Sequence, residues 1–141
     1  EIRVSGNNKN NTMNIEGIKV STQKSAKEVY AFFTDLSNFK HLMPENIEKF
    51  EVDGTSFIFG LKGMPEIRLV LKEKIEYSKI SLGAASSKLP FTLVAHIEEL
   101  SENTATVQLQ FQGEFNPMMA MMIKKPLTKF VETLSENIGK I

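Results

Sequence analysis

The amino-acid sequence predicts an α+β fold in which a curved antiparallel sheet wraps around a long C-terminal helix. Three observations predict it: two short helical segments follow the first strand, period-two alternation fills residues 47–115, and an amphipathic helix of about 22 residues comes last. Short turns separate the alternating runs, so neighbouring strands are expected to pair antiparallel. The predicted order of elements is β-α-α-β-β-β-β-β-β-α.

Polar residues dominate the start of the sequence, and residues 6–11 show no apolar periodicity. We expect residues 1–13 to be a flexible arm or a remnant added during cloning. An added edge strand through Ile2 and Val4 is the alternative. The remaining residues, 14–141, are expected to form a single domain, because domains of about 100–150 residues are common.

Residues 15–23 alternate between apolar and polar side chains, which predicts the first strand. The first helix is expected to begin after Ser25, because Ser25 and Glu28 have the spacing of a capping box. Asp35 can cap a second short helix, which Pro44 helps to end. These two helices precede the main run of strands.

Six further strands are expected near 47–53, 55–61, 66–76, 79–84, 90–99 and 104–115. The dipeptide Asp53-Gly54 is a strong hairpin signal between the first two of them. In the last strand, Val107, Leu109 and Phe111 share one face, and glutamines occupy the other. This pattern predicts a sheet with one buried face and one solvated face.

The long helix is expected to begin after Asn116, a favourable N-cap followed by Pro117, and to run to about Ile138. Pro126 lies inside it and removes the hydrogen bond to the carbonyl of Met122. We expect a kink there, which could turn the first half of the helix over a cavity mouth. The alternative is a bend that follows the curved sheet.

Residues 118–123 read MMAMMI and are apolar around the whole helix, which packing on one sheet does not require. Three interpretations remain open. The short helices or a loop cover the extra apolar face, methionine side chains line a cavity, or the face is an exposed patch for a membrane or a partner.

Charge and composition narrow the classes of partner. The 17 Lys and Arg residues balance the 17 Asp and Glu residues, so general electrostatic binding of nucleic acid is not expected. The absence of cysteine removes disulfides and thiolate chemistry. No apolar run is long enough to span a bilayer, so we expect a cytoplasmic protein without stable membrane insertion. The two histidines, His41 and His96, lack metal-ligand spacing, so no metal or cofactor is predicted.

Four segments carry a family resemblance: SAKEVYAFF at 25–33, DLSNFKHLMP at 35–44, KGM at 62–64 and NPMM at 116–119. In these segments and in the order of elements, residues 14–141 resemble the small bacterial members of the SRPBCC, or START-like, superfamily. Its helix-grip fold also occurs in the birch-pollen-allergen-like proteins. The resemblance implies an internal cavity for lipids, polyketides, isoprenoids or similar molecules. It implies no catalytic residues, because its carriers, sensors, cyclases and co-chaperones share no catalytic signature.

The favoured interpretation is binding or carriage of an apolar small molecule in a cavity between the sheet and the C-terminal helix. One alternative is a polyketide cyclase/dehydratase-like enzyme in which Glu73 or His41 moves protons. Alternation places Glu73 on the inner face, unless a bulge takes it out of the core. The other alternative is a protein-interaction module that uses the methionine-rich helix start. The candidate cavity residues are Phe33, Phe39, Met43, Phe57, Phe59, Phe91, Phe111, Met118 and Met122.

Overall fold

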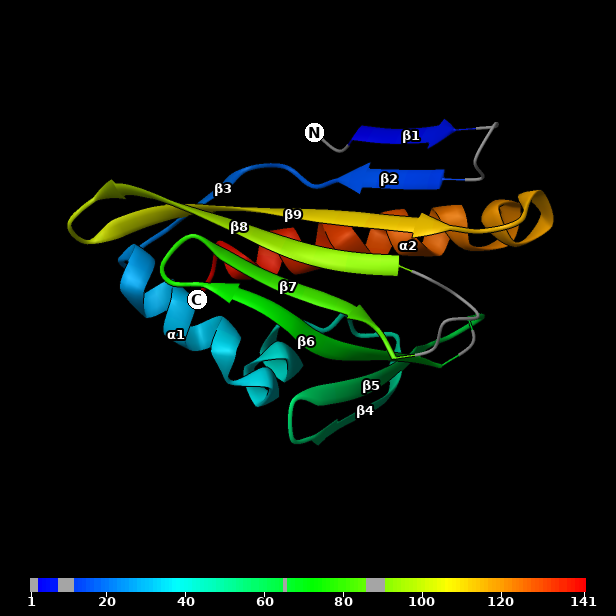
Figure 1. The fold of residues 1–141 in the computed structure, drawn as a ribbon, viewed down its shortest axis with the longest axis horizontal. Helices are drawn as coiled ribbons and strands as arrows, with labels where there is room; N and C mark the ends of the chain where they lie inside the picture. The colour runs from blue at the N-terminus through cyan, green and yellow to red at the C-terminus, as the bar shows by residue number, and fades with distance from the viewer. Residues whose placement is uncertain (1–2, 8–11, 65, 86–90) are drawn as a thin grey trace.

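The computed structural model of the protein describes residues 3–7, 12–64, 66–85 and 91–141. Its elements follow the predicted order, with the first strand divided in two and one strand added before it (Figure 1). Their bounds are β1 (Arg3–Asn7), β2 (Thr12–Glu16), β3 (Val20–Thr22), α1 (Ala26–Thr34), the 3₁₀ helix η1 (Leu36–Leu42), β4 (Ile47–Asp53), β5 (Ser56–Leu61), β6 (Ile67–Ile75), β7 (Lys79–Ala84), β8 (Phe91–Ser101), β9 (Thr104–Glu114) and α2 (Pro117–Ile138).

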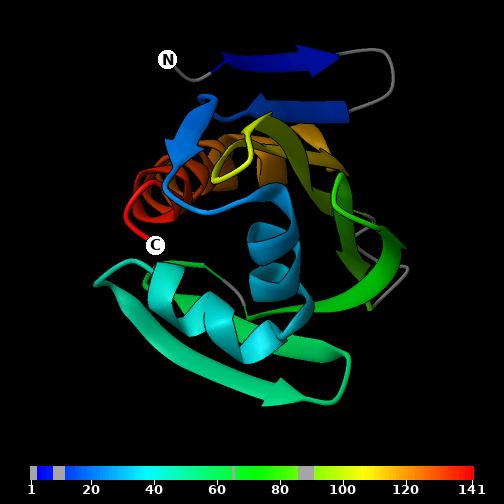
Figure 2. The ribbon, with the colours of Figure 1, turned by 90° about the vertical axis from the view of Figure 1, so that its left-hand side faces the viewer.

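The strands form one sheet in the order β1-β2-β9-β8-β7-β6-β5-β4, and β3 also pairs with β9. Every pairing is antiparallel. The sheet curves so that α1 and α2 lie within its bend (Figure 2). The predicted α+β helix-grip architecture is therefore confirmed.

The predicted strand over 15–23 is interrupted by Gly17 and the two residues after it. A Cβ atom on Gly17 would lie only 2.7 Å from the Oγ of Ser135 in α2. The Gly17 N–H instead donates to the carbonyl of Leu109 at 2.8 Å, and its own carbonyl accepts from the Gln108 side chain at 2.9 Å. The close approach of α2 therefore fixes where the strand breaks.

The N-terminal segment adds a strand to the edge of the sheet. Residues 3–7 form β1 and pair with β2, with Val4 opposite Ile15. This pairing agrees with the alternative interpretation, in which the segment adds an edge strand. Residues 3–7 and 12–13 lie in strands and not in a flexible arm. Pairing satisfies backbone groups along the edge of β2 that would otherwise be open. Ile2 and residues 8–11 lie outside the described residues.

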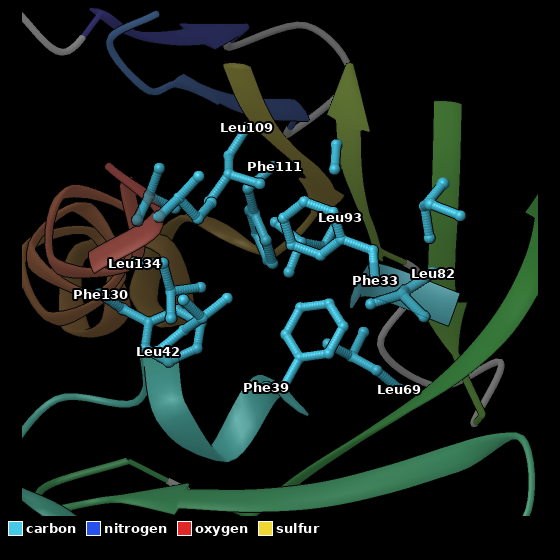
Figure 3. Close-up of a cluster of buried hydrophobic side chains, with 14 of the residues drawn as sticks. Phe33, Phe39, Leu42, Leu69, Leu82, Leu93, Leu109, Phe111, Phe130 and Leu134 are labelled. Atoms are coloured by element: carbon cyan, nitrogen blue, oxygen red, sulfur yellow. The ribbon is translucent and has the colours of Figure 1, made fainter. Parts of the chain in front are cut away.

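The predicted inner face of the sheet is buried. Val107, Leu109 and Phe111 of β9 are each at most 3% exposed, whereas the glutamines between them lie on the outer side. Figure 3 shows side chains of α1, η1 and α2 meeting those of the sheet in one cluster. Within it, the rings of Phe59 and Phe130 stack with centroids 4.7 Å apart, which fixes α2 against β5.

Candidate functional site

An apolar pocket lies beneath the first half of α2, where that helix passes over the starts of β6 and β8 and the end of β9. Its volume is about 10 Å³, which is room for about one water molecule. Every described residue of its wall is apolar. The wall is formed by Met64, Ile67, Phe91, Phe111, Phe115, Met119, Ile123 and Leu127.

One wall of the pocket is a row of three aromatic rings. The centroid of Phe111 lies 5.6 Å from that of Phe91 and 6.4 Å from that of Phe115, and the rings of Phe111 and Phe115 are nearly parallel. Gly113 permits this row, because a Cβ atom there would lie 2.6 Å from the Phe115 ring and 2.9 Å from the Cβ of Phe91. The glycine between two inward phenylalanines is thus part of the site.

The opposite wall comes from α2 and from the turn between β5 and β6. Met119, Ile123 and Leu127 are spaced four residues apart, which places them on one face of the helix. Met64 enters from the turn, where its N–H donates to the Leu61 carbonyl at 3.0 Å. Met64 and Met119 are only half-buried, whereas Leu127 is fully buried. The two methionines therefore form the outer part of this wall.

A larger and more open pocket of about 410 Å³ adjoins the apolar one. Ile67 and Phe91 belong to the walls of both, so the two spaces meet at these side chains. The other described wall residues of the larger pocket are Ile58, Glu66, Arg68, Ala84 and Ala85. The site therefore combines an apolar interior with a mouth that carries charged groups.

The two charged groups at the mouth have different partners. Arg68 donates from Nη1 to the Oγ of Ser56 at 2.9 Å. The Glu66 carboxylate lies 3.6 Å from the Lys49 ammonium, which lies 3.2 Å from Glu51. The hydrogen bond to Glu51, and then the charges of Glu51 and Glu66, raise the pKa of Lys49. The carboxylate is thus matched by a cation, while the guanidinium keeps further N–H donors for another acceptor.

The predicted cavity residues divide into three groups. Phe91 and Phe111 line the apolar pocket. Met118 and Met122 are 75% and 64% exposed, which places them outside the pocket to which the sequence assigned them. The remaining five pack in the core away from both described pockets, with Met43 half-buried there; they are Phe33, Phe39, Met43, Phe57 and Phe59.

The two proposed proton-transfer residues lie at the surface. Glu73 is exposed, and its carboxylate is 3.1 Å from the Lys79 ammonium. The predicted inner-face position is wrong, because a bulge between Leu71 and Glu73 shifts the alternation by one residue. His41 is exposed in the last turn of η1. Neither residue lines the two described pockets.

The described residues carry neither a cluster of metal ligands nor a membrane-spanning helix. Among these, no three His, Asp or Glu side chains gather as a metal ion would require. In the same part of the chain, no helix is long and apolar enough to cross a membrane.

Solved structures with the same architecture include three informative neighbours. Norcoclaurine synthase from Thalictrum flavum, in complex with dopamine and hydroxybenzaldehyde, has a TM-score of 0.68 and 15% identity, over 99% of this chain and 94% of that one. A START superfamily protein from Mycobacterium smegmatis has a TM-score of 0.62 and 11% identity, over 90% and 97%. An uncharacterised protein from Bacillus thuringiensis has a TM-score of 0.60 and 10% identity, over 89% and 98%.

No protein-family model matches the sequence, and no curated protein matches it. Similarity at 10–15% identity shows a shared fold, and here it extends over nearly the whole length of both chains. The sheet, the long helix and the pocket between them define a helix-grip protein. It shares its fold with norcoclaurine synthase and with the START superfamily protein, which confirms the helix-grip fold that the sequence predicted.

Proposed function

We propose that this protein binds an apolar or amphipathic small molecule between α2 and the sheet, with the tail or ring system of the ligand in the pocket beneath Met119. One observation carries the proposal: every described residue of that pocket's wall is apolar. Burying apolar ligand surface contributes roughly 25 cal/mol per Å², so such a wall needs no special chemistry to hold a lipid-like molecule.

The volume of the pocket sets a condition on binding. At about 10 Å³ it is too small for an organic ligand, so side chains must move when one enters. Met64 and Met119 are suited to this because methionine is unbranched and rotates easily, and both are half-buried. The ligand would enter past Ile67 and Phe91 from the 410 Å³ mouth.

The mouth suggests which end of a ligand stays near solvent. Arg68 lies in the wall of the mouth, and its guanidinium has donors beyond the one used by Ser56. A carboxylate or carbonyl oxygen is the natural acceptor for such a group. We therefore propose a ligand with an apolar body and one oxygen-bearing end, a description that fits lipids, polyketides and oxidised isoprenoids.

The structural neighbours support small-molecule binding as a use of this fold. Norcoclaurine synthase was solved with dopamine and hydroxybenzaldehyde bound, both of which are small aromatic molecules. The cyclase-like alternative relied on His41 or Glu73 as its proton-transfer group, and neither residue lines the two described pockets. Binding is therefore the function that we propose.

Titration with parinaric acid, a fluorescent fatty acid, tests binding directly, and native mass spectrometry of the purified protein tests for a retained ligand. Met119→Trp should fill the pocket and weaken binding by at least about tenfold, or roughly 1.4 kcal/mol. Met118→Trp is the matched control, because Met118 is exposed one residue away. Equal affinities of the two variants, at unchanged thermal stability, would exclude this pocket.

A second comparison tests the role of Arg68. Arg68→Gln should weaken binding of parinaric acid by about tenfold and leave binding of its methyl ester nearly unchanged. Lys72→Gln removes a positive charge from the same strand at a position outside both pocket walls, so it should affect neither ligand. Equal losses for acid and ester would show that Arg68 has no specific role.

A further inference from the structure

The first half of α2 presents an apolar surface on its outer side as well as on its pocket side. Met118, Met121 and Met122 are 75%, 83% and 64% exposed, while Ile123 is buried and Met119 half-buried against the core. The pocket explains the inner side of this helix segment. Nothing in the described part of the chain covers the three outer methionines.

The exposed methionines form one continuous surface with two lysines. Spacings of three and four residues place Met118, Met121, Met122 and Lys125 on the same side of the helix, with Lys124 beside them. Both lysines are exposed. Residues 115–131 contain three lysines and no acidic residue, although the whole chain has no net charge. We call the surface of Met118, Met121, Met122, Lys124 and Lys125 the methionine face.

We propose that the methionine face docks on the surface of a membrane that contains anionic lipids. The methionine side chains enter the boundary between headgroups and acyl chains, where burial of an amphipathic helix face is favourable. The two ammonium groups reach the phosphates while their aliphatic stems lie along the apolar layer. The helix lies in the plane of the surface, which needs no membrane-spanning segment.

A second copy of the chain fits this face less well. In a two-fold symmetric dimer the same patch faces itself, which would bring the lysines of both copies together. A stable interface also needs about 800 Å² from each partner, far more than three methionine side chains supply. A membrane needs neither a complementary shape nor an extended patch, and anionic lipid matches the local positive charge.

The methionine face and one wall of the pocket lie on the same turns of α2, which matters for ligand exchange. Met119 and Ile123 line the pocket from the same turns of helix that carry the methionine face outward. A docked protein would therefore hold its pocket close to the lipid from which an apolar ligand can transfer. The docking itself does not depend on the proposed ligand, and it can be measured with the pocket empty.

Flotation with vesicles tests the inference. The full chain should float with vesicles of phosphatidylcholine mixed with phosphatidylglycerol and stay behind with phosphatidylcholine alone. The combined change Met118→Ser, Met121→Ser and Met122→Ser should reduce binding by at least about tenfold. Lys124→Gln with Lys125→Gln should reduce it by about tenfold on anionic vesicles, and added salt should mimic this effect on the wild type.

The matched control is Val52→Ser with Leu100→Ser. These residues are 39% and 56% exposed and lie outside the helix, so their loss should leave flotation unchanged. All the substituted side chains are exposed, and each variant should retain the wild-type melting temperature. The inference is overturned if the wild type does not float, or if the control loses as much binding as the methionine variant. A dimer in solution that the methionine changes dissociate would also overturn it, because the face would then join two copies.

Discussion

The two halves of α2 belong to one continuous helix but have opposite relations to the rest of the molecule. After Pro126, Leu127, Phe130 and Leu134 are each at most 3% exposed and pack on the inner face of the sheet. Before Pro126, the outer methionines lie in solvent and the inner side borders a pocket. One sequence pattern, an apolar stripe on a helix, thus contributes both to the core and to the wall of a pocket.

The second half also makes a side-chain hydrogen bond to another element of the fold, which the first half lacks among the described residues. Asn137 donates to the Leu42 carbonyl at 2.9 Å, and Ser135 lies directly beneath Gly17. The side-chain hydroxyl of Ser135 donates to the Val131 carbonyl at 2.8 Å, so it has a partner within the buried layer. We infer that the second half determines global stability and that the first half can rearrange locally.

The largest contrast is expected from truncating one side chain in each half. Phe130→Ala removes the ring stacked on Phe59 and should reduce the free energy of unfolding by about 3–5 kcal/mol. Met121→Ala should change it by less than about 0.5 kcal/mol, because that side chain is 83% exposed. Urea unfolding of both variants measures the difference. Similar losses would show that the two halves contribute equally to stability.

The contact between Gly17 and the second half should have an intermediate effect. Gly17→Ala places a methyl group 2.7 Å from the Ser135 Oγ and 3.2 Å from Cγ1 of Val131, so we expect a loss of about 1–3 kcal/mol. Ser135→Ala removes the closer atom, and in the double variant the two losses should therefore not add. Strict additivity in urea unfolding would indicate that the two residues do not compete for space.

Hydrogen exchange tests whether the first half opens on its own. Pro126 has no N–H to donate to the Met122 carbonyl, so the helix is weakened where its halves join. Backbone amides of residues 119–125 should exchange at least about tenfold faster than those of residues 130–137. Pro126→Ala restores the donor and should narrow this gap. An unchanged gap would assign the difference to packing alone.

Much of this architecture could be predicted, because side-chain alternation and helical spacing are local properties of the sequence. The burial of Val107, Leu109 and Phe111 follows from period two alone. The start of α2 follows from Asn116, whose side chain accepts from the Met119 N–H at 2.8 Å. These features need no knowledge of distant residues.

The predictions from the sequence are wrong where a distant contact or an extra residue overrides the local pattern. Gly17 breaks its strand because Ser135, far away in the sequence, lies against it. One bulge moves Glu73 from the inner face to an exposed ion pair with Lys79. Within MMAMMI, composition could not separate the inward Met119 from the outward Met118, because all sides of the helix are apolar there. The spacing of Met119, Ile123 and Leu127 was the signal that could have separated them.

The smallest expected effects concern the first turns of α1 and α2. Ser25→Ala and Asn116→Ala each remove an N-cap, a change typically worth about 1 kcal/mol, but they should differ in how they depend on pH. The backbone N–H of Ser25 donates to the Glu28 carboxylate at 3.0 Å, and this bond, with the one from the Ser25 side chain, lowers the pKa of Glu28. A lowered pKa stabilises the fold above the ordinary pKa of glutamate, and this contribution disappears as the pH falls through the lowered value.

Ser25→Ala keeps the backbone N–H that donates to Glu28 but removes the hydroxyl, which also lowers the pKa of that carboxylate. The effect of Ser25→Ala should therefore shrink in acid, where the wild type loses the contribution of the hydroxyl as Glu28 is protonated. Asn116 does not titrate, and its bond to the Met119 N–H should contribute equally at both ends of the pH range. Thermal unfolding of the wild type and both variants at neutral and acidic pH measures these differences. Asn116→Ala should in addition speed amide exchange in residues 119–125 more than it lowers global stability, since the cap lies in the half that opens locally. If Asn116→Ala instead lowered global stability as much as Ser25→Ala did, with no local change in exchange, the first half of α2 would unfold only with the rest of the protein.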